Sequence, residues 1–353
     1  MNITIEKVGY HDLAQVQKIF TESFSDEVNP SHIKQRINRM RQFYYFFRPF
    51  AHISPWAKNL FNIYVIKCDG AIAGFSQVSY INYKELHIDY IAVRKQYRGQ
   101  GLGNWALRKL LDEVADVNNL NVVLEVKSGN TAYHLYKRLG FSTQARILEY
   151  AKTFEATCAT LVPPVLPGLR PLQSIDRTQL YELHRTILPK GLQQNIKQNY
   201  QRFNPSLFVR NLEWIKNRLM KEIKREFVVE IDKNIVASLQ INSCPKVASH
   251  IIIVMLHPDY ENLRESLLRY ALFFLRKKYK NGKAITTIYN DNLRKQQALN
   301  KLGFSQEKNY RLMIRQPKPG PKQTPIAPKI MAYPEKLVIP TAMKANNRKK
   351  LIK

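Results

Sequence analysis

The segment Tyr97–Asn104, which reads Tyr-Arg-Gly-Gln-Gly-Leu-Gly-Asn, carries the strongest chemical signal in the sequence. Its three glycines permit backbone conformations that other residues avoid, and they let a ligand approach the main chain closely. Apolar residues recur at helical spacing from Trp105 onward, so the segment leads into a helix N-terminus, where free N–H groups and the helix dipole attract anions. Arg98 adds a charged hydrogen-bond donor. The segment therefore predicts a turn that binds a phosphate or diphosphate group.

The elements around this turn separate it from a dinucleotide-binding turn. The preceding residues, Leu86–Val93, alternate and are rich in β-branched side chains, which predicts a half-buried strand. At least three strand-like segments come before the turn, whereas a dinucleotide-binding fold places its phosphate turn after the first strand. Downstream follow a Leu-Glu-Val strand at 124–126, Asn130, and a helix end that reads Leu-Tyr-Lys-Arg-Leu-Gly-Phe at 135–141.

This order of an Arg-x-x-Gly-x-Gly turn, a Leu-Glu-Val strand, an Asn and a Leu-Tyr-x-x-x-Gly-Phe helix end resembles the GNAT superfamily of acyl-CoA-dependent N-acyltransferases. The resemblance runs from about Ile3 to Phe154. It implies an α/β (α+β) fold with a mixed central sheet flanked by helices, and an N-acetyltransferase that uses acetyl-CoA as cosubstrate and no metal. The residues that it implies for binding acetyl-CoA are Ile91, Ala92, Val93, Arg98, Gly99, Gln100, Gly101, Leu102, Gly103, Asn104 and Asn130.

The same resemblance suggests roles in acyl transfer by direct attack of an amine on the thioester. Tyr136 is the expected proton donor to the departing thiolate, and its alternative is an aromatic ring packed inside the fold. Glu125 is the expected base that deprotonates the amine, with Asp89 as second choice. His87 is a further candidate, although a histidine at the matching place of a second repeat, His250, favours a packing role. Asn130 has an equally good explanation as a helix N-cap.

The second half of the chain repeats the first. The segments 69–78 and 232–241 share a pattern at a separation of 163 residues, and Arg-Leu-Gly-Phe-Ser at 138–142 matches Lys-Leu-Gly-Phe-Ser at 301–305 at the same separation. The second copy, however, has Glu-Asn-Leu-Arg-Glu-Ser at 261–266 opposite the glycine turn, and Leu299 opposite Tyr136. A period this long indicates a duplicated domain. We therefore expect two tandem GNAT folds, of which the first is active and the second degenerate.

The expected organisation has four parts: a catalytic domain at 1–155, a Pro-rich linker at 156–168, a degenerate GNAT-like domain at 169–315 and a basic, Pro- and Lys-rich tail at 316–353. The predicted strands are 3–8, 63–68, 72–80, 86–93 and 121–126, with closing strands over 141–154 that complete the first domain. An Asp-Gly turn of hairpin type at 69–70 joins the second and third of these strands. Helices are expected at 12–24, after the glycine turn, and at 131–139, and a basic helical region extends to residue 60.

The net charge of +29 favours acidic partners, and two basic stretches contribute to it. Residues 31–61 combine six Lys or Arg with many aromatic residues, which suits an acceptor pocket, an anionic lipid surface or simple packing. The tail is a candidate for RNA or ribosome attachment. Scattered cysteines, no metal-binding spacing, and neither a signal segment nor a membrane span predict a cytoplasmic protein.

Three functions remain open at this point. The first is acetyl transfer from acetyl-CoA to an amine, which is a protein N-terminus, a lysine or a small amine. The second is aminoacyl transfer from aminoacyl-tRNA by a tandem GNAT fold, which the basic charge suits and the intact acyl-CoA turn disfavours. The third is a non-catalytic protein that binds acetyl-CoA or RNA, which the presence of Tyr136 and Glu125 disfavours.

Overall fold

The computed structural model of the protein describes residues 2–24, 41, 44–47, 62–82, 84–155, 164–187, 218, 222–290 and 293–318. The chain divides into a compact unit, Met1–Lys318, and a terminal segment, Pro319–Lys353. Most of the basic stretch 31–61, linker residues 156–163 with Cys158, and the tail beyond 318 lie outside the described residues. No helix in the described ranges is both long and apolar enough to cross a membrane.

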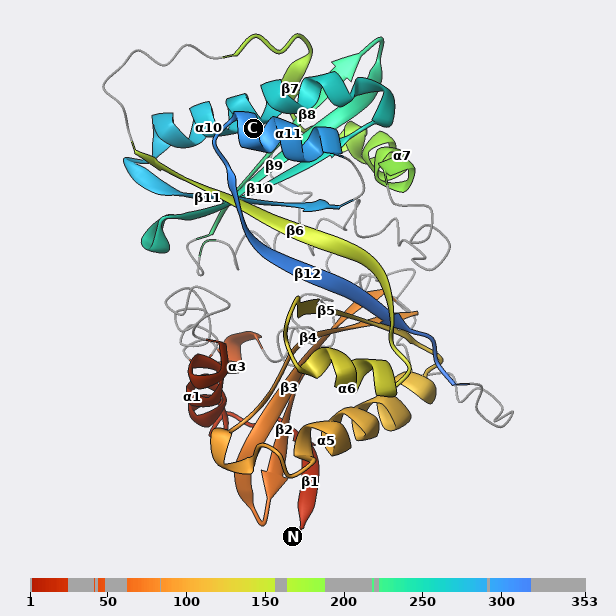
Figure 1. Cartoon of the computed structure of the whole chain (residues 1–353). Helices are drawn as coiled ribbons and strands as arrows, with labels where there is room; N and C mark the ends of the chain where they lie inside the picture. The colour runs from red at the N-terminus through yellow and green to blue at the C-terminus, as the bar shows by residue number, and fades with distance from the viewer. Residues whose placement is uncertain are drawn as a thin grey trace, which may run out of the picture. The chain divides into compact units, whose positions relative to one another are not determined.

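The first repeat follows the predicted order of elements closely (Figure 1). Leu13, Val16, Ile19 and Phe20 are buried at helical spacing on α1, and Asp69-Gly70 forms a hairpin turn with positive φ at both residues, as predicted. Its elements are β1 (Ile3–Lys7), α1 (Leu13–Phe24), α3 (Tyr44–Phe47), β2 (Ile63–Cys68), β3 (Ala71–Asn82), β4 (Glu85–Val93), α5 (Leu102–Leu110, continued by a π-helical turn Leu111–Asp116), β5 (Asn121–Lys127), α6 (Ala132–Arg138) and β6 (Ser142–Glu155).

Apart from the short helix α3, the described strands and helices of the second repeat follow in the same order as those of the first, so the duplication predicted from the sequence is confirmed at the level of the fold. Apolar residues of α7 and α10 are buried against the sheet in the same way, for example Leu183 and Leu275. Its elements are β7 (Leu169–Pro171), α7 (Arg177–Ile187), β8 (Ile223–Ile231), β9 (Asn234–Cys244), β10 (Ser249–Leu256), α10 (Arg264–Lys278), β11 (Asn281–Tyr289), α11 (Leu293–Lys301) and β12 (Ser305–Arg315).

The described strands form one 12-stranded sheet in the order β1-β2-β3-β4-β5-β12-β6-β11-β10-β9-β8-β7. We expected residues 141–154 to close the first domain, but β12 lies between β5 and β6, and β6 pairs with β11. The two repeats therefore exchange their last strands, which run side by side through the middle of the sheet (Figure 1). Ile147 pairs with Tyr310, its own equivalent 163 residues later, so the exchange is symmetric about this pair.

Each hydrophobic core is completed by the exchanged strand of the other repeat. Met313 of β12 belongs to the buried cluster under α5 and α6 in the first repeat. Leu148, Tyr150 and Phe154 of β6 belong to the cluster under α10 in the second repeat. Since both cores contain residues from both halves of the sequence, cutting the chain between the repeats removes a core strand from each.

A buried ion pair fixes the end of β12 in the first repeat. Arg315, of which 3% is exposed, donates through two nitrogens to the carboxylate of Asp116 at 2.7 and 2.8 Å and through Nε to the carbonyl of Leu139 at 3.1 Å. Burial acts to raise the pKa of Asp116, but the hydrogen bonds from Arg315 and from the N–H of Lys318 outweigh it and lower the pKa. This bidentate contact ties the last strand of the second repeat to the helix that precedes β5.

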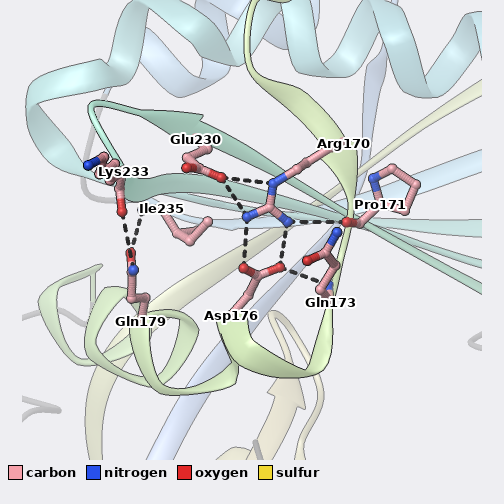
Figure 2. A network of polar contacts seen from close by, with 8 residues as sticks. All are labelled: Arg170, Pro171, Gln173, Asp176, Gln179, Glu230, Lys233 and Ile235. Atoms are coloured by element: carbon pink, nitrogen blue, oxygen red, sulfur yellow. Dashed lines mark hydrogen bonds and ion pairs between the residues drawn. The ribbon is translucent and has the colours of Figure 1, made fainter.

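The second repeat has an ion-pair network of its own, at the junction of β7, β8 and α7 (Figure 2). Arg170 donates to both carboxylate oxygens of Asp176 and to Glu230, and its hydrogen bonds to Asp176 lower the pKa of that carboxyl group. Gln179 accepts from the N–H of Ile235 and donates to the carbonyl of Lys233, which fixes α7 against the β8–β9 turn.

The Arg315–Asp116 pair leads to a prediction about stability. Asp116→Asn leaves the buried guanidinium without its counter-ion, so it should lower the free energy of unfolding by about 3 kcal/mol, measured as a shifted midpoint in chemical denaturation. The pKa of Asp116 is lowered on folding, so its contribution is present above the ordinary aspartate pKa and is lost as the pH falls through the folded-state value.

The matched control for this prediction is Glu113→Gln, one turn earlier on the same helical segment. Glu113 forms an exposed pair with Lys109 at 2.6 Å, so its loss should change stability by no more than about 0.5 kcal/mol. Equal effects of the two substitutions would contradict the role given to Arg315.

Candidate functional site

The first repeat opens between its two parallel strands. The β4–β5 ladder begins at Glu85 opposite Asn121 and ends at Ile88 opposite Leu124, although β4 continues to Val93 and β5 to Lys127. Beyond this point Ile91, Ala92 and Val93 pair only with β3 among the described strands. The edge of β4 that faces β5 is thus left for a ligand, because exposed strand edges bind extended partners through main-chain hydrogen bonds.

A β-bulge lies where the ladder ends. Gln77 of β3 pairs with Tyr90 and Val78 pairs with Ile88, so Asp89 is the extra residue on β4. A bulge bends its strand and redirects the neighbouring side chains. Here it coincides with the separation of β4 from β5, and it places Asp89 at the opening.

A polar cluster surrounds the bulge. The Asp89 carboxylate accepts from the hydroxyl of Ser79 through Oδ2, and its Oδ1 lies 2.8 Å from Nδ1 of His87. His87 and Asp89 keep 23% and 21% of their side chains exposed. Ser79 and His87 are directly paired across β3 and β4, so both side chains project from the same face of the sheet. That face is the one covered by α1, because Phe75, on the same side of β3, packs in the α1 cluster.

Charges around His87 favour its protonated form. Burial acts to lower the pKa of His87, but the hydrogen bond to Asp89 and the negative charges of Asp89, Glu125 and Glu85 outweigh it and raise the pKa. Glu125 is an exposed residue that follows the last ladder pair on β5. The two expected carboxylates, Glu125 and Asp89, thus both lie close enough to influence His87, which the sequence comparison had favoured as a packing residue.

Tyr136 lies on the opposite face. Its ring is 8% exposed, stands edge-on to Phe141 at 5.9 Å, and belongs to the buried cluster that contains Ile88 and Leu124. That cluster lies under α5 and α6. The opening between β4 and β5 is thus flanked by Tyr136 on one side of the sheet and by His87, Asp89 and Glu125 on the other.

The glycine turn has an accessible main chain. Gly99 and Gly101 have φ of 78° and 80°, and nothing lies within 4 Å of the place where a Cβ would sit. The first backbone hydrogen bond of α5 runs from Trp105 N–H to the Gly101 carbonyl, and no side chain caps this end. The N–H groups of Leu102, Gly103 and Asn104 therefore point out of the helix toward the turn, which suits a diphosphate such as that of acetyl-CoA.

The polar side chains of the turn are engaged within the protein. Arg98 donates to the carbonyl of Val93 at 2.9 Å and to Ser23 of α1 at 3.2 Å, so it joins β4 to α1. Gln100 donates to the carbonyl of Gln96, and Asn104 accepts from Arg108. Asn130 accepts from the N–H of Ala132, the first residue of α6, at 2.9 Å, so its side chain fixes the turn that leads into this helix. Contacts of these side chains with a ligand stay predictions.

Sequence reasoning missed three cations beside the turn. Lys18 of α1 and Arg94 and Lys95, which follow β4, line a cavity of about 350 Å³ together with Glu22 and Gln96. Arg94 and Lys95 could have been found from the sequence, because they directly precede the turn. Lys18 could not, because only the packing of α1 brings it to this cavity. The described residues contain no group of three His, Cys, Asp or Glu placed to hold a metal ion.

The second repeat keeps the separation of its two parallel strands, because the β10–β11 ladder ends at Ile252 opposite Thr286, but it lacks the glycine turn, the buried tyrosine and the bulge. Glu261 and Arg264 pair with each other at the start of α10, where the first repeat has its glycine turn. Leu299, which is 1% exposed, stands at the place of Tyr136. The two positions match because the Leu299 carbonyl accepts from the N–H of Phe304, just as the Tyr136 carbonyl accepts from the N–H of Phe141. Strand β10 pairs with β9 without interruption, so it has no bulge and no counterpart of Asp89.

The missing bulge corrects the alignment of the two histidines. Ser79 pairs with His87, and its equivalent Asn242 pairs with Ile251, so Ile251 and not His250 occupies the place of His87. His250 is fully buried, its Nδ1 lies 2.9 Å from the Ser243 hydroxyl, and burial lowers its pKa to about 4. The equivalence of His87 and His250 was therefore wrong, and it gives no support for a packing role of His87.

Comparison with known proteins identifies relatives of the first repeat. The acetyltransferase (GNAT) family matches residues 15–141. The chain is 32% identical over 120 residues to an N-alpha-acetyltransferase of Sulfurisphaera tokodaii, which is 30% of this chain and 68% of that protein. It is 30% identical over 88 residues to the spermidine N(1)-acetyltransferase of Escherichia coli K12, 24% of this chain and 47% of that one. The chain thus spans about half the length of this last relative.

Solved structures match nearly the whole chain. A tandem GNAT protein from the clavulanic acid biosynthesis pathway superimposes with a TM-score of 0.60 at 12% identity, over 91% of this chain and 100% of that one. A GCN5-related N-acetyltransferase from Sphaerobacter thermophilus gives a TM-score of 0.58 at 14% identity, over 91% and 98%. At these identities the likeness shows the fold alone, and it extends over both repeats.

The glycine turn gives a prediction with an internal control. Gly101→Val should weaken acetyl-CoA binding by about tenfold or more in calorimetry, because the side chain strains a backbone with positive φ and fills the space above it. Gly70→Val introduces the same strain at φ 82° in the β2–β3 hairpin, where space is equally open. It should reduce stability without changing affinity. Equal affinity of both variants would rule out ligand binding at the turn.

Proposed function

The chain belongs to the acetyltransferase (GNAT) family, and we propose that it transfers an acetyl group from acetyl-CoA to a cationic primary amine at the β4–β5 opening of the first repeat. The active unit consists of residues 1–155 together with the exchanged strand β12, and the second repeat binds no acetyl-CoA. The observation that carries this proposal is the arrangement at the opening, where a glycine turn with an accessible main chain, a strand edge left unpaired by the described strands, a buried tyrosine and a carboxylate cluster meet.

Each part of the donor site has a task in this proposal. The N–H groups of the Gly99–Asn104 turn bind the diphosphate, and main-chain groups of Ile91, Ala92 and Val93 hold the arm that carries the thioester. Asn130 orients the start of α6 beside it. Tyr136, on the α5 and α6 side, gives a proton to the thiolate as the carbon–sulfur bond breaks.

The acceptor enters from the α1 side, where Asp89 and Glu125 lie. Carboxylates attract an ammonium group, and a base in this cluster removes the proton that blocks its attack. The negative cluster stands out in a chain with 56 Lys and Arg against 27 Asp and Glu, so the local charge selects a cation even though the whole protein is basic. The names of two relatives, a spermidine and an N-alpha acetyltransferase, indicate a polyamine and a protein N-terminus as the amines to test first.

The experiment is thiol release from acetyl-CoA by the purified full-length protein, measured with spermidine, with a peptide beginning in alanine, and with a lysine peptide whose N-terminus is blocked. Activity with at least one amine is expected. Tight binding of acetyl-CoA without turnover on any amine would favour a non-catalytic binding protein, and no binding of acetyl-CoA would refute the proposal.

Tyr136→Phe provides the mechanistic prediction. The phenylalanine keeps the ring in its buried cluster and removes only the hydroxyl, so turnover should fall by about 100-fold while acetyl-CoA affinity stays within about twofold. Tyr133→Phe, three residues earlier on the same helix and only half-buried, is the control and should retain full turnover. If both variants turn over as the wild type does, Tyr136 is a packing residue.

A further inference from the structure

We propose that Nε2 of His87 is the atom that accepts the proton of the acceptor ammonium, and that Asp89 is a positioning residue that holds the imidazole through Nδ1. This assignment rests on the proposed acetyl transfer and names its base. It replaces direct proton transfer to Asp89 and leaves Glu125 the task of attracting the amine.

The contacts of Asp89 argue against its acting alone. Both of its oxygens are engaged, one with the Ser79 hydroxyl and the other with His87 at 2.8 Å. An anionic oxygen on Nδ1 fixes the neutral imidazole in the tautomer that carries a proton on Nδ1 and a lone pair on Nε2. Within the described residues Nε2 has no hydrogen-bond partner, and 23% of the side chain remains exposed at the opening. Unlike Asp89, whose two oxygens are engaged, His87 therefore keeps a free proton-accepting atom.

The second repeat shows that the fold does not require a histidine here. Ile251 stands at the place of His87 and is 46% exposed, and Asp89 has no counterpart. Thr287 takes the place of Glu125. It pairs with Glu149, whereas Glu125 pairs with Leu312, the equivalent of Glu149 in the other repeat. The histidine and both carboxylates are thus absent together from the copy that lacks the phosphate-binding turn, which ties all three to the ligand rather than to the sheet.

The transfer step is balanced as follows. The acceptor ammonium gives one proton to Nε2 of His87, and its nitrogen then forms a bond to the thioester carbonyl carbon. The carbon–sulfur bond breaks, and the thiolate takes the proton of Tyr136. The second proton of the former amine nitrogen restores the tyrosine, and His87 releases its proton to water. One ammonium and one thioester thus give one amide, one thiol and one free proton.

The charges that face His87 set the direction of its pH dependence. Asp89 and Glu85 on β4 and Glu125 on β5 face it, and Ser79 on β3 donates to Asp89. Burial acts to lower the pKa of His87, but the hydrogen bond to Asp89 and the three negative charges raise it. The base is active when neutral, so kcat/KM should rise as the pH increases through the pKa of His87. Asp89→Asn removes one negative charge beside the imidazole, so it should move this rise to lower pH.

The test uses the full-length protein, acetyl-CoA and an amine that the wild type acetylates. His87→Gln should lower kcat/KM by about 100-fold near neutral pH and abolish the rise with pH, while acetyl-CoA affinity stays within about twofold. Added imidazole should restore part of the activity of His87→Ala. The control is His134→Gln, an exposed histidine on α6, which should behave as the wild type.

A second measurement does not depend on turnover. The imidazole resonances of His87, assigned by their loss in His87→Gln, should titrate above the ordinary histidine pKa in the wild type and lower in Asp89→Asn. A wild type that releases no thiol with any amine refutes the acetyl transfer and this role with it. A wild type that is active, with the same pH profile in His87→Gln or an unmoved profile in Asp89→Asn, refutes the role of His87 alone.

Discussion

The antiparallel pairing of β6 with β12 is the constraint on which the rest of the protein depends. Each strand begins in its own repeat and ends in the core of the other, so Met313 completes the first core and Phe154 the second. The β5 strand that bears Glu125 is held on one edge by β4 only up to Leu124, and on its other edge by β12 along Val122–Lys127. A strand that must separate from one neighbour needs the other to stay in place, and here that neighbour comes from the second repeat.

This dependence gives the second repeat a physical reason to persist without its own ligand turn. Its strand β12 supports β5 at the opening, and Arg315 locks that strand to Asp116. At the equivalent place in the second repeat, Lys152 reaches the carbonyl of Leu302 as Arg315 reaches that of Leu139. Burial and the charges of Arg276 and Arg269 lower the pKa of Lys152, and no carboxylate is among the charges that shift it. The bidentate Arg315–Asp116 ion pair is therefore found in the repeat that contains the candidate site.

Much of the fold was predictable because its signals are local. The glycine turn, the Asp69-Gly70 hairpin and the bounds of β2 follow from residue types at fixed spacing, and the structure confirms them. The strand exchange was not predictable, because β6 and β12 occupy the same place in their repeats and either can pair beside β5 with the same pattern of apolar residues. Choosing between them requires long-range contacts such as Arg315 with Asp116.

The site was predicted in part, and its error has a single physical source. An ungapped comparison of the repeats set His250 opposite His87, whereas one bulged residue, Asp89, shifts the strand by one position. Because side chains on a strand alternate between faces, a shift of one residue moves a side chain to the other face. His250 is thus buried under α10, and Ile251 shares the outward position of His87.

The bulge also explains how a positive and a negative potential can lie close together in the first repeat. Salt screens exposed charges over about 8 Å under physiological conditions, so the net charge of +29 does not set the potential inside a half-buried cluster. The N-terminus of α5 offers positive potential to the phosphates of a donor, while Asp89, Glu85 and Glu125 offer negative potential on the α1 side. The bulge turns Asp89 toward that side, so the proposed reaction would bind its anionic donor and its cationic acceptor at places of opposite potential.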